Sequence, residues 1–163
     1  MTATNPIPLV LAGWDLSITA NGTPAGQGRV SFLGKGRPAI HSNQKTLKPW
    51  RAAIMAAAER AMLHHRHATL AGVPVQTDIT ITVPKPSSAP KRRRTWPVTR
   101  FSSDLDHHVR AIHDSLSEAK VFADDSQVVE MSARKVYPGE HEFALSEPGA
   151  VVHVRVLPEA VAR

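Results

Sequence analysis

Two short groups of aspartates, about twenty residues apart, are the part of this sequence most able to do chemistry. The first is Asp104-Leu105-Asp106 and the second is Asp124-Asp125. Two carboxylates about 4 Å apart repel by roughly 4 kcal/mol at an effective dielectric constant near 20, so a cluster of them is costly without a cation. Mg²⁺ prefers carboxylate oxygens and water as ligands. If the fold brings the two groups together, they form a metal site.

The segment between the two groups predicts the elements that must position them. Apolar residues recur at steps of four, three and four, which predicts a helix with one buried face over residues 105–118. These residues are Leu105, Val109, Ile112 and Leu116. Residues 127–136 alternate like a strand. A helix and a strand that pack together can bring their carboxylates to one point.

A basic, proline-rich stretch lies immediately before the first aspartates. Residues 84–103 contain four prolines and a run of cations, and we expect them to form a flexible loop. Cations beside an acidic site are expected to contact the phosphates of a nucleic acid. Trp96 in this loop suits either stacking on an unpaired base or anchoring the loop to the body of the protein. The candidate DNA contacts are Lys91, Arg92, Arg93, Arg94 and Arg100, with Lys35 and Arg37 in an earlier turn.

The rest of the chain predicts the sheet on which these elements pack. Strands are expected at residues 9–20, 75–83 and 150–157, and an alanine-rich helix at 47–70. A hairpin is expected over 29–41. This order predicts a single α/β (α+β) domain over residues 1–163, with a mixed sheet and two main helices packed on it.

Composition excludes several classes of site. The chain has 163 residues, a formal net charge of +6 and no cysteine. Disulfides, thiolate zinc sites and a cysteine nucleophile are therefore excluded, and a polyanionic partner is favoured. No apolar run is long enough for a membrane span, and the start of the chain does not resemble a secretory signal. We expect a cytoplasmic protein that does not bind membranes.

Each aspartate group also has an ordinary structural explanation, because short motifs match often by chance. Asp104 suits the N-cap of a helix, and Asp106 suits the positive end of the helix dipole. Asp124-Asp125 suits a turn before a strand.

Several spaced identities distinguish between these explanations. The segments are Asp104-Leu105-Asp106, Arg110, Asp114-Ser115-Leu116 and Ala123-Asp124-Asp125-Ser126-Gln127-Val128-Val129. Together they resemble the core signature of the RusA-type Holliday junction resolvases. That signature is Asp-x-Asp-Asn, a basic residue four positions later, Asp-Ala-Leu, and then Asp-Asp-x-Gln-Val. The sequence departs from it at His107, which replaces Asn, and at Arg110, where Lys is common. His107 is expected to support the metal ligands.

The resemblance implies a small homodimeric, Mg²⁺-dependent endonuclease, in which Mn²⁺ can substitute. Such enzymes nick two strands of a four-way DNA junction symmetrically by metal-assisted phosphodiester hydrolysis, in DNA recombination and repair. Many are carried by phages and prophages. The catalytic carboxylates map to Asp104, Asp106 and Asp125, and the catalytic basic residue maps to Arg110. Asp124 is a further candidate metal ligand. The expected location is the bacterial cytoplasm or a phage-infected cell.

Two other functions remain open at this point. The chain could be a basic, dimeric DNA-binding protein whose acidic cluster is only structural. It could also be a nuclease that prefers other branched DNA, such as forks or flaps.

Overall fold

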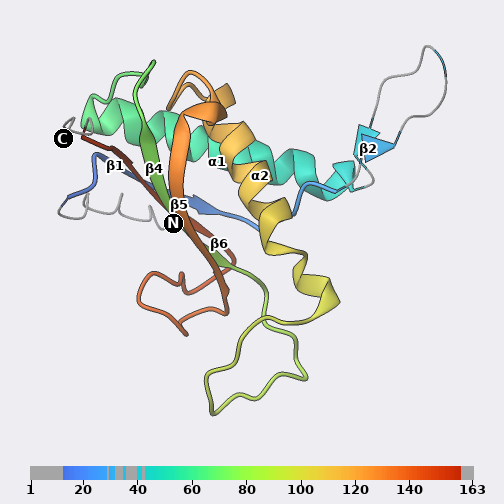
Figure 1. Cartoon of the computed structure of the whole chain (residues 1–163). Coiled ribbons are helices and arrows are strands. Elements are labelled where there is room, and N and C mark those ends of the chain that lie inside the picture. The colour runs from blue at the N-terminus through green and yellow to red at the C-terminus, as the bar shows by residue number, and fades with distance from the viewer. Residues whose placement is uncertain (1–12, 29, 32–34, 36–39, 42, 159–163) are drawn as a thin grey trace, which may run out of the picture.

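The computed structural model describes residues 13–28, 30–31, 35, 40–41 and 43–158 (Figure 1). The predicted strand residues 9–12 and the predicted DNA contact Arg37 lie outside these residues. In chain order the elements are β1 (Leu16–Asn21), β2 (Val30–Ser31), β3 (Ile40–His41), α1 (Gln44–His65), β4 (Val75–Thr82), the 3-10 turn η1 (Arg100–Ser102), α2 (Leu105–Glu118), the 3-10 turn η2 (Asp125–Gln127), β5 (Val128–Val136) and β6 (Gly149–Val156).

The main sheet is mixed and has the order β1-β6-β4-β5. Strands β4 and β5 pair in parallel, whereas β6 pairs antiparallel with both β4 and β1. Parallel strands need a long crossover, and here loop 84–103 and α2 supply it. The predicted α/β (α+β) class, with a mixed sheet in one domain, is confirmed.

Both helices pack against the sheet and against each other, as Figure 1 shows. Alternate residues of the strands join the helices in one core, which includes Ile18, Ile79 and Val154. Helix α1 contributes Trp50 and α2 contributes Ile112, each at most 2% exposed. Because β4 alternates, its core residues point to the side that carries the helices. Of the helices in the described part of the chain, none is long and apolar enough to cross a membrane.

The boundaries of α2 agree with the prediction, but those of α1 differ from the predicted 47–70. The helix starts at Gln44, after an N-cap at Asn43 whose carbonyl accepts from Thr46 N–H and Leu47 N–H. It ends at His65, because Arg66 adopts a left-handed conformation with φ 51°. The bonds from Arg66 N–H and His67 N–H to carbonyls of the last turn close the helix end, without the glycine that usually does so.

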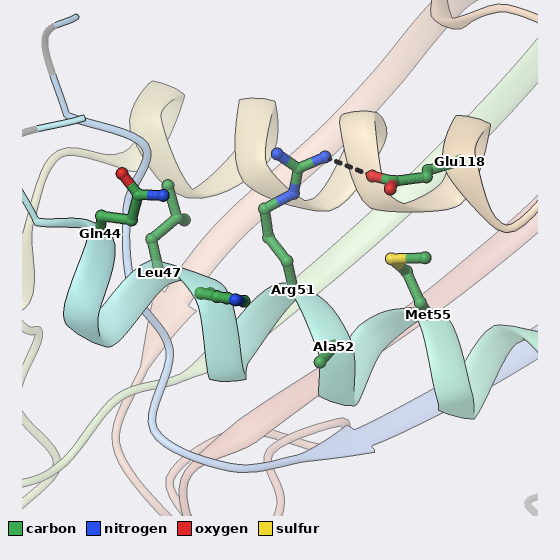
Figure 2. A pocket seen from close by; sticks show the side chains of 7 residues that line it. Gln44, Leu47, Arg51, Ala52, Met55 and Glu118 are labelled. Carbon is green, nitrogen blue, oxygen red and sulfur yellow. Dashed lines mark hydrogen bonds and ion pairs between the residues drawn. The ribbon is translucent and has the colours of Figure 1, made fainter. Parts of the chain in front are cut away.

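A surface groove runs between α1 and α2 (Figure 2). Arg51 of α1 donates to Glu118 at the end of α2 across it, at 2.7 Å. The Glu118 side chain is 56% exposed, so this ion pair contributes little to stability. The groove lies at the opposite end of α2 from Asp104.

Candidate active site

The start of α2 gathers two of the predicted metal ligands. Asp104, Asp106 and His107 each offer one ligand atom, and these three atoms lie within 4.8 Å of one another. Asp104 is the N-cap of α2, but its side chain makes no capping hydrogen bond. Both aspartates are exposed, and His107 Nε2 lies 3.9 Å from Asp106 Oδ2. The two carboxylates are therefore free to bind a cation. The His107 ring is close enough to bind the same cation directly, and not only to support the aspartates.

Two side chains, the buried His108 and the half-buried Lys135, hold the backbone just before Asp104. Ser103 has a positive φ of 59°, a conformation that is strained for a residue with a side chain. Lys135 of β5 donates to the Ser103 carbonyl at 2.6 Å and to Ser102 Oγ at 3.0 Å. His108 Nε2–H donates to the Ser102 carbonyl at 2.7 Å. Burial lowers the pKa of His108, which keeps its ring neutral near pH 7. These bonds fix the position of the backbone from which the Asp104 side chain projects.

Lys135 contacts the candidate site, and the sequence analysis missed it. The sequence did contain an indication of this contact. Alternation along the predicted strand 127–136 places Lys135 on the face of the sheet that the helices cover. A cation at such a position needs a buried polar partner. Burial lowers the pKa of Lys135, and the nearby Asp104 carboxylate acts in the opposite direction.

The segment before β2 packs closely against the same turn. Gln27 N–H donates to the His107 carbonyl at 2.9 Å. A Cβ atom added to Gly26 would press on Ser103 Oγ and lie 2.9 Å from His107 Cβ, closer than real Cβ atoms approach. Glycine is therefore needed at position 26 because the backbone there packs directly against the side chains of Ser103 and His107.

If the turn that carries Asp104 serves the DNA nicking that the resemblance implies, Gly26→Ala should reduce that activity tenfold or more, because it displaces this turn. A shift of about 1 Å in a catalytic group can cost roughly a hundredfold in rate. Ser103→Gly removes two of the three atoms that the new methyl group would meet, and its backbone suits a positive φ. The double variant should recover part of the rate. Nicking assays on both variants test this, and an unaffected Gly26→Ala enzyme would contradict it.

The second aspartate group lies in the 3-10 turn that precedes β5. Asp124 caps this turn, and its carboxylate accepts from Ser126 N–H at 2.9 Å. Gln127 completes a capping box by accepting from the Asp124 and Ala123 N–H groups. The hydrogen bonds from Ser126 lower the pKa of Asp124. Asp124 therefore has a structural task, whereas Asp125 is exposed and has no such bond among the described residues.

The structure does not bring Asp125 to Asp104 and Asp106 within one chain. Helix α2 runs antiparallel to β5, since Lys135 at the end of β5 contacts Ser103 at the start of α2. Asp125 lies instead near His113, in the third turn of α2. Burial lowers the pKa of His113, and the carboxylates of Asp125 and Asp114 partly offset that effect. The fourteen residues of α2 span about 20 Å. The convergence expected from a helix and its neighbouring strand is therefore absent from a single chain.

The predicted cations occupy three separate places. Arg110 is exposed one turn after Asp106, and it forms no ion pair with any residue that the structure describes. The basic run of loop 84–103 is exposed and lines a shallow pocket together with Glu140. Its members there are Lys91, Arg92, Arg93 and Arg94. Arg100 lies in η1 and Lys35 in the short turn after β2, and both are exposed.

One carboxylate anchors loop 84–103 to the body. Glu140 accepts a hydrogen bond from Lys85 and another from Thr95 N–H, at opposite sides of the basic run. Both bonds lower the pKa of Glu140, and the bond from Lys85 has the larger effect. Trp96 is half exposed and lies under the Arg94 guanidinium, at 4.6 Å from its ring centre. Further on, Phe101 is fully exposed three residues before Asp104, which the sequence pattern did not reveal.

Glu140→Gln is expected to release this loop and speed tryptic cleavage at the basic run several-fold. Because the folded-state pKa of Glu140 is lowered, the anchor holds at neutral pH and is lost as the pH falls through that pKa. Limited proteolysis measures the rate. Glu142→Gln, an exposed neighbour, is the control and should cleave like the wild type. Equal rates in the two variants would show that Glu140 does not restrain the loop.

Comparison with known families adds one finding to this geometry. Residues 21–146, well over half of the chain, match the family model described as "Endodeoxyribonuclease RusA". A comparison with curated proteins gives no match. The matched region contains α1, β4, loop 84–103, α2 and β5, and therefore every predicted site residue.

Proposed function

Since the chain belongs to the endodeoxyribonuclease RusA family, we propose that it resolves four-way DNA junctions as a divalent-metal-dependent homodimer. The observation that supports this most is the pair of unengaged carboxylates at the start of α2, beside an exposed basic loop. A purely structural acidic turn would use the Asp104 side chain as a cap, as Asp124 does in its own turn.

The donor set fits a hard divalent cation. Asp104 and Asp106 offer exposed oxygens close together, which suits Mg²⁺, and Mn²⁺ would also accept the nitrogen of His107. Asp125 is the proposed third carboxylate ligand. Asp124 is a weaker candidate, because its carboxylate already accepts a hydrogen bond from Ser126 N–H. When bound, the metal would activate water and neutralise the leaving oxygen.

Positioning of the carboxylates, stabilisation of the phosphate charge and DNA binding would be carried out by side chains of the protein. Lys135 and His108 fix the backbone turn that carries Asp104, so this backbone is already in place before the reaction. Arg110 stands one turn further along α2, where it can stabilise charge on the scissile phosphate. The basic run of loop 84–103 would follow the DNA backbone and hold the junction in position.

Cleavage of a four-way junction, a fork and a linear duplex, side by side with and without Mg²⁺, tests this function. We expect paired nicks in the junction only, and only with metal. Binding without any nicking at all metal concentrations would instead favour a non-catalytic DNA-binding protein. Equal cleavage of the fork would favour a broader branch-specific nuclease.

A further inference from the structure

Among the described residues, the third metal donor beside Asp104 and Asp106 is the ring of His107. One atom from each of these three side chains lies within 4.8 Å of the other two. Two ligands of one octahedral ion, each at about 2.1 Å from it, lie about 3 to 4.2 Å apart. The three donors therefore need only small side-chain rotations to reach one cation.

The first turn of α2 explains why these side chains converge. Asp104 is the N-cap, Asp106 is the second residue of the helix and His107 is the third. Residues three apart on a helix are neighbours on its surface, so position 107 lies beside position 104. A side chain at the third position often reaches back to the N-cap. Because the Asp104 carboxylate makes no capping hydrogen bond, it stays available to a cation shared with this neighbour.

The packing around His107 holds the residue in place and leaves its ring nitrogens unengaged. Its carbonyl accepts from Gln27 N–H at 2.9 Å, and Gly26 packs against its Cβ atom. Its side chain is 32% exposed, against 71% for Asp106. The 3.9 Å from His107 Nε2 to Asp106 Oδ2 is too long for a hydrogen bond. Neither ring nitrogen forms a hydrogen bond with a residue that the structure describes.

A nitrogen donor changes which cation such a site selects. Mg²⁺ strongly favours oxygen ligands. First-row transition ions also bind imidazole, and their affinity for sites of nitrogen and oxygen rises from Mn²⁺ through Fe²⁺ and Co²⁺ to Cu²⁺. Of these ions, Mn²⁺ shares the preference of Mg²⁺ for carboxylate and water. The RusA signature has Asn where this chain has His107, so the chain offers a ring nitrogen in place of an amide oxygen.

We propose that His107 is a direct metal ligand, and that it makes the Asp104–Asp106 site select Mn²⁺ over Mg²⁺. This inference rests on the proposed metal-dependent function, and it names the ion and the residue that selects it. The two aspartates supply the negative charge that any divalent cation requires. His107 supplies the preference between two cations of equal charge.

Metal affinity measures this selection. Calorimetric titrations of the protein, without a polyhistidine tag, give the dissociation constants of Mn²⁺ and Mg²⁺. His107→Asn should weaken Mn²⁺ binding at least about tenfold, since even the loss of a residue that only supports a ligand costs about 10–100-fold. Mg²⁺ binding should change little. Equal losses for the two ions would overturn the selection, because a ring that only balances charge serves both ions alike.

Electron spin-echo spectroscopy of bound Mn²⁺ tests direct ligation. The nitrogen nucleus of a coordinated imidazole modulates the echo, whereas a ring that only forms an ion pair with Asp106 does not bond to the metal. The wild type should show this nitrogen modulation, and His107→Asn should lose it. Tightly bound Mn²⁺ without the modulation in the wild type would overturn the proposal.

His64→Asn is the matched control. This exposed histidine lies at the end of α1, where its ring and that of His65 offer transition ions another source of nitrogen. The variant should keep the Mn²⁺ affinity and the nitrogen modulation of the wild type. Loss of the modulation here would place the bound ion at α1 and overturn the proposal. Matching thermal melts without metal show that both variants fold.

Junction cleavage distinguishes a failure of this inference from a failure of the proposed function. A wild type that cuts the junction in Mn²⁺ but shows no nitrogen modulation keeps the function and rejects His107 as a ligand. A wild type that binds Mn²⁺ through His107 and cuts no junction supports the ligand and rejects the function. If both hold, His107→Asn should lower cleavage in Mn²⁺ more than in Mg²⁺.

Discussion

Asp104→Asn and Asp106→Asn are each expected to reduce junction cleavage at least about a hundredfold, a loss comparable to that of a transition-state charge-stabilising group. The substitution keeps the size of the side chain and removes the charge that holds the cation. Both side chains are exposed, so the variants should fold and still bind the junction. Single-turnover cleavage and a separate binding measurement in Ca²⁺ distinguish lost chemistry from lost binding.

The same variants should separate an enzymatic cluster from a structural one by their response to metal. Mg²⁺ at a hundred times its dissociation constant should stabilise the wild type by about 2.7 kcal/mol, and most of this effect should vanish in Asp106→Asn. If Asp106 only complements the helix dipole, its loss should cost about 0.3–1 kcal/mol whether or not Mg²⁺ is present. Asp124→Asn is the matched control. Asparagine keeps an oxygen that accepts from Ser126 N–H and caps a helical turn about as well as aspartate, so this variant should keep its stability and most of its cleavage rate.

Replacing Arg92, Arg93 and Arg94 together with alanine is expected to weaken DNA binding strongly and to flatten its dependence on salt. Each lost phosphate contact lowers the slope of log affinity against log salt by about 0.9, so three contacts lower it by up to about 2.7. The three side chains are exposed, and none forms an ion pair within the described part of the chain.

Binding titrations at several salt concentrations measure this slope. A control variant removes three exposed cations of α1, Lys45, Lys48 and Arg60, and keeps the same net charge as the loop variant. If both variants lose the same slope, the effect is one of total charge. If the loop variant keeps the wild-type slope, the loop does not contact phosphate.

The sequence predicted the elements that carry their own signals. The apolar period of α2 and the aspartate before it defined both of its ends, and alternation placed β4 to within one residue. The resemblance to the RusA family is confirmed by the family match. The end of α1 could not be predicted, because a left-handed arginine terminates it where composition favours more helix. The anchor at Glu140 is likewise a contact between distant residues with no local pattern.

The position of Asp125 shows how a local argument can fail. A short connection joins α2 to β5, so the strand must begin where the helix ends. Residues just before each element then lie at opposite ends of the pair, and packing cannot unite them. The prediction treated helix and strand as free to meet at any point. Chain direction alone would have shown that the two aspartate groups separate within one molecule.

Three remote parts of the chain meet around Asp104: Gly26 before the helices, the Ser103 turn, and Lys135 near the end of β5. Only the completed sheet holds them together. During synthesis, a chain that has not yet emerged as far as Lys135 lacks the bond that fixes the Ser103 backbone. The candidate site would therefore be among the last features to form, and unfinished copies of the chain would lack the backbone geometry that positions Asp104.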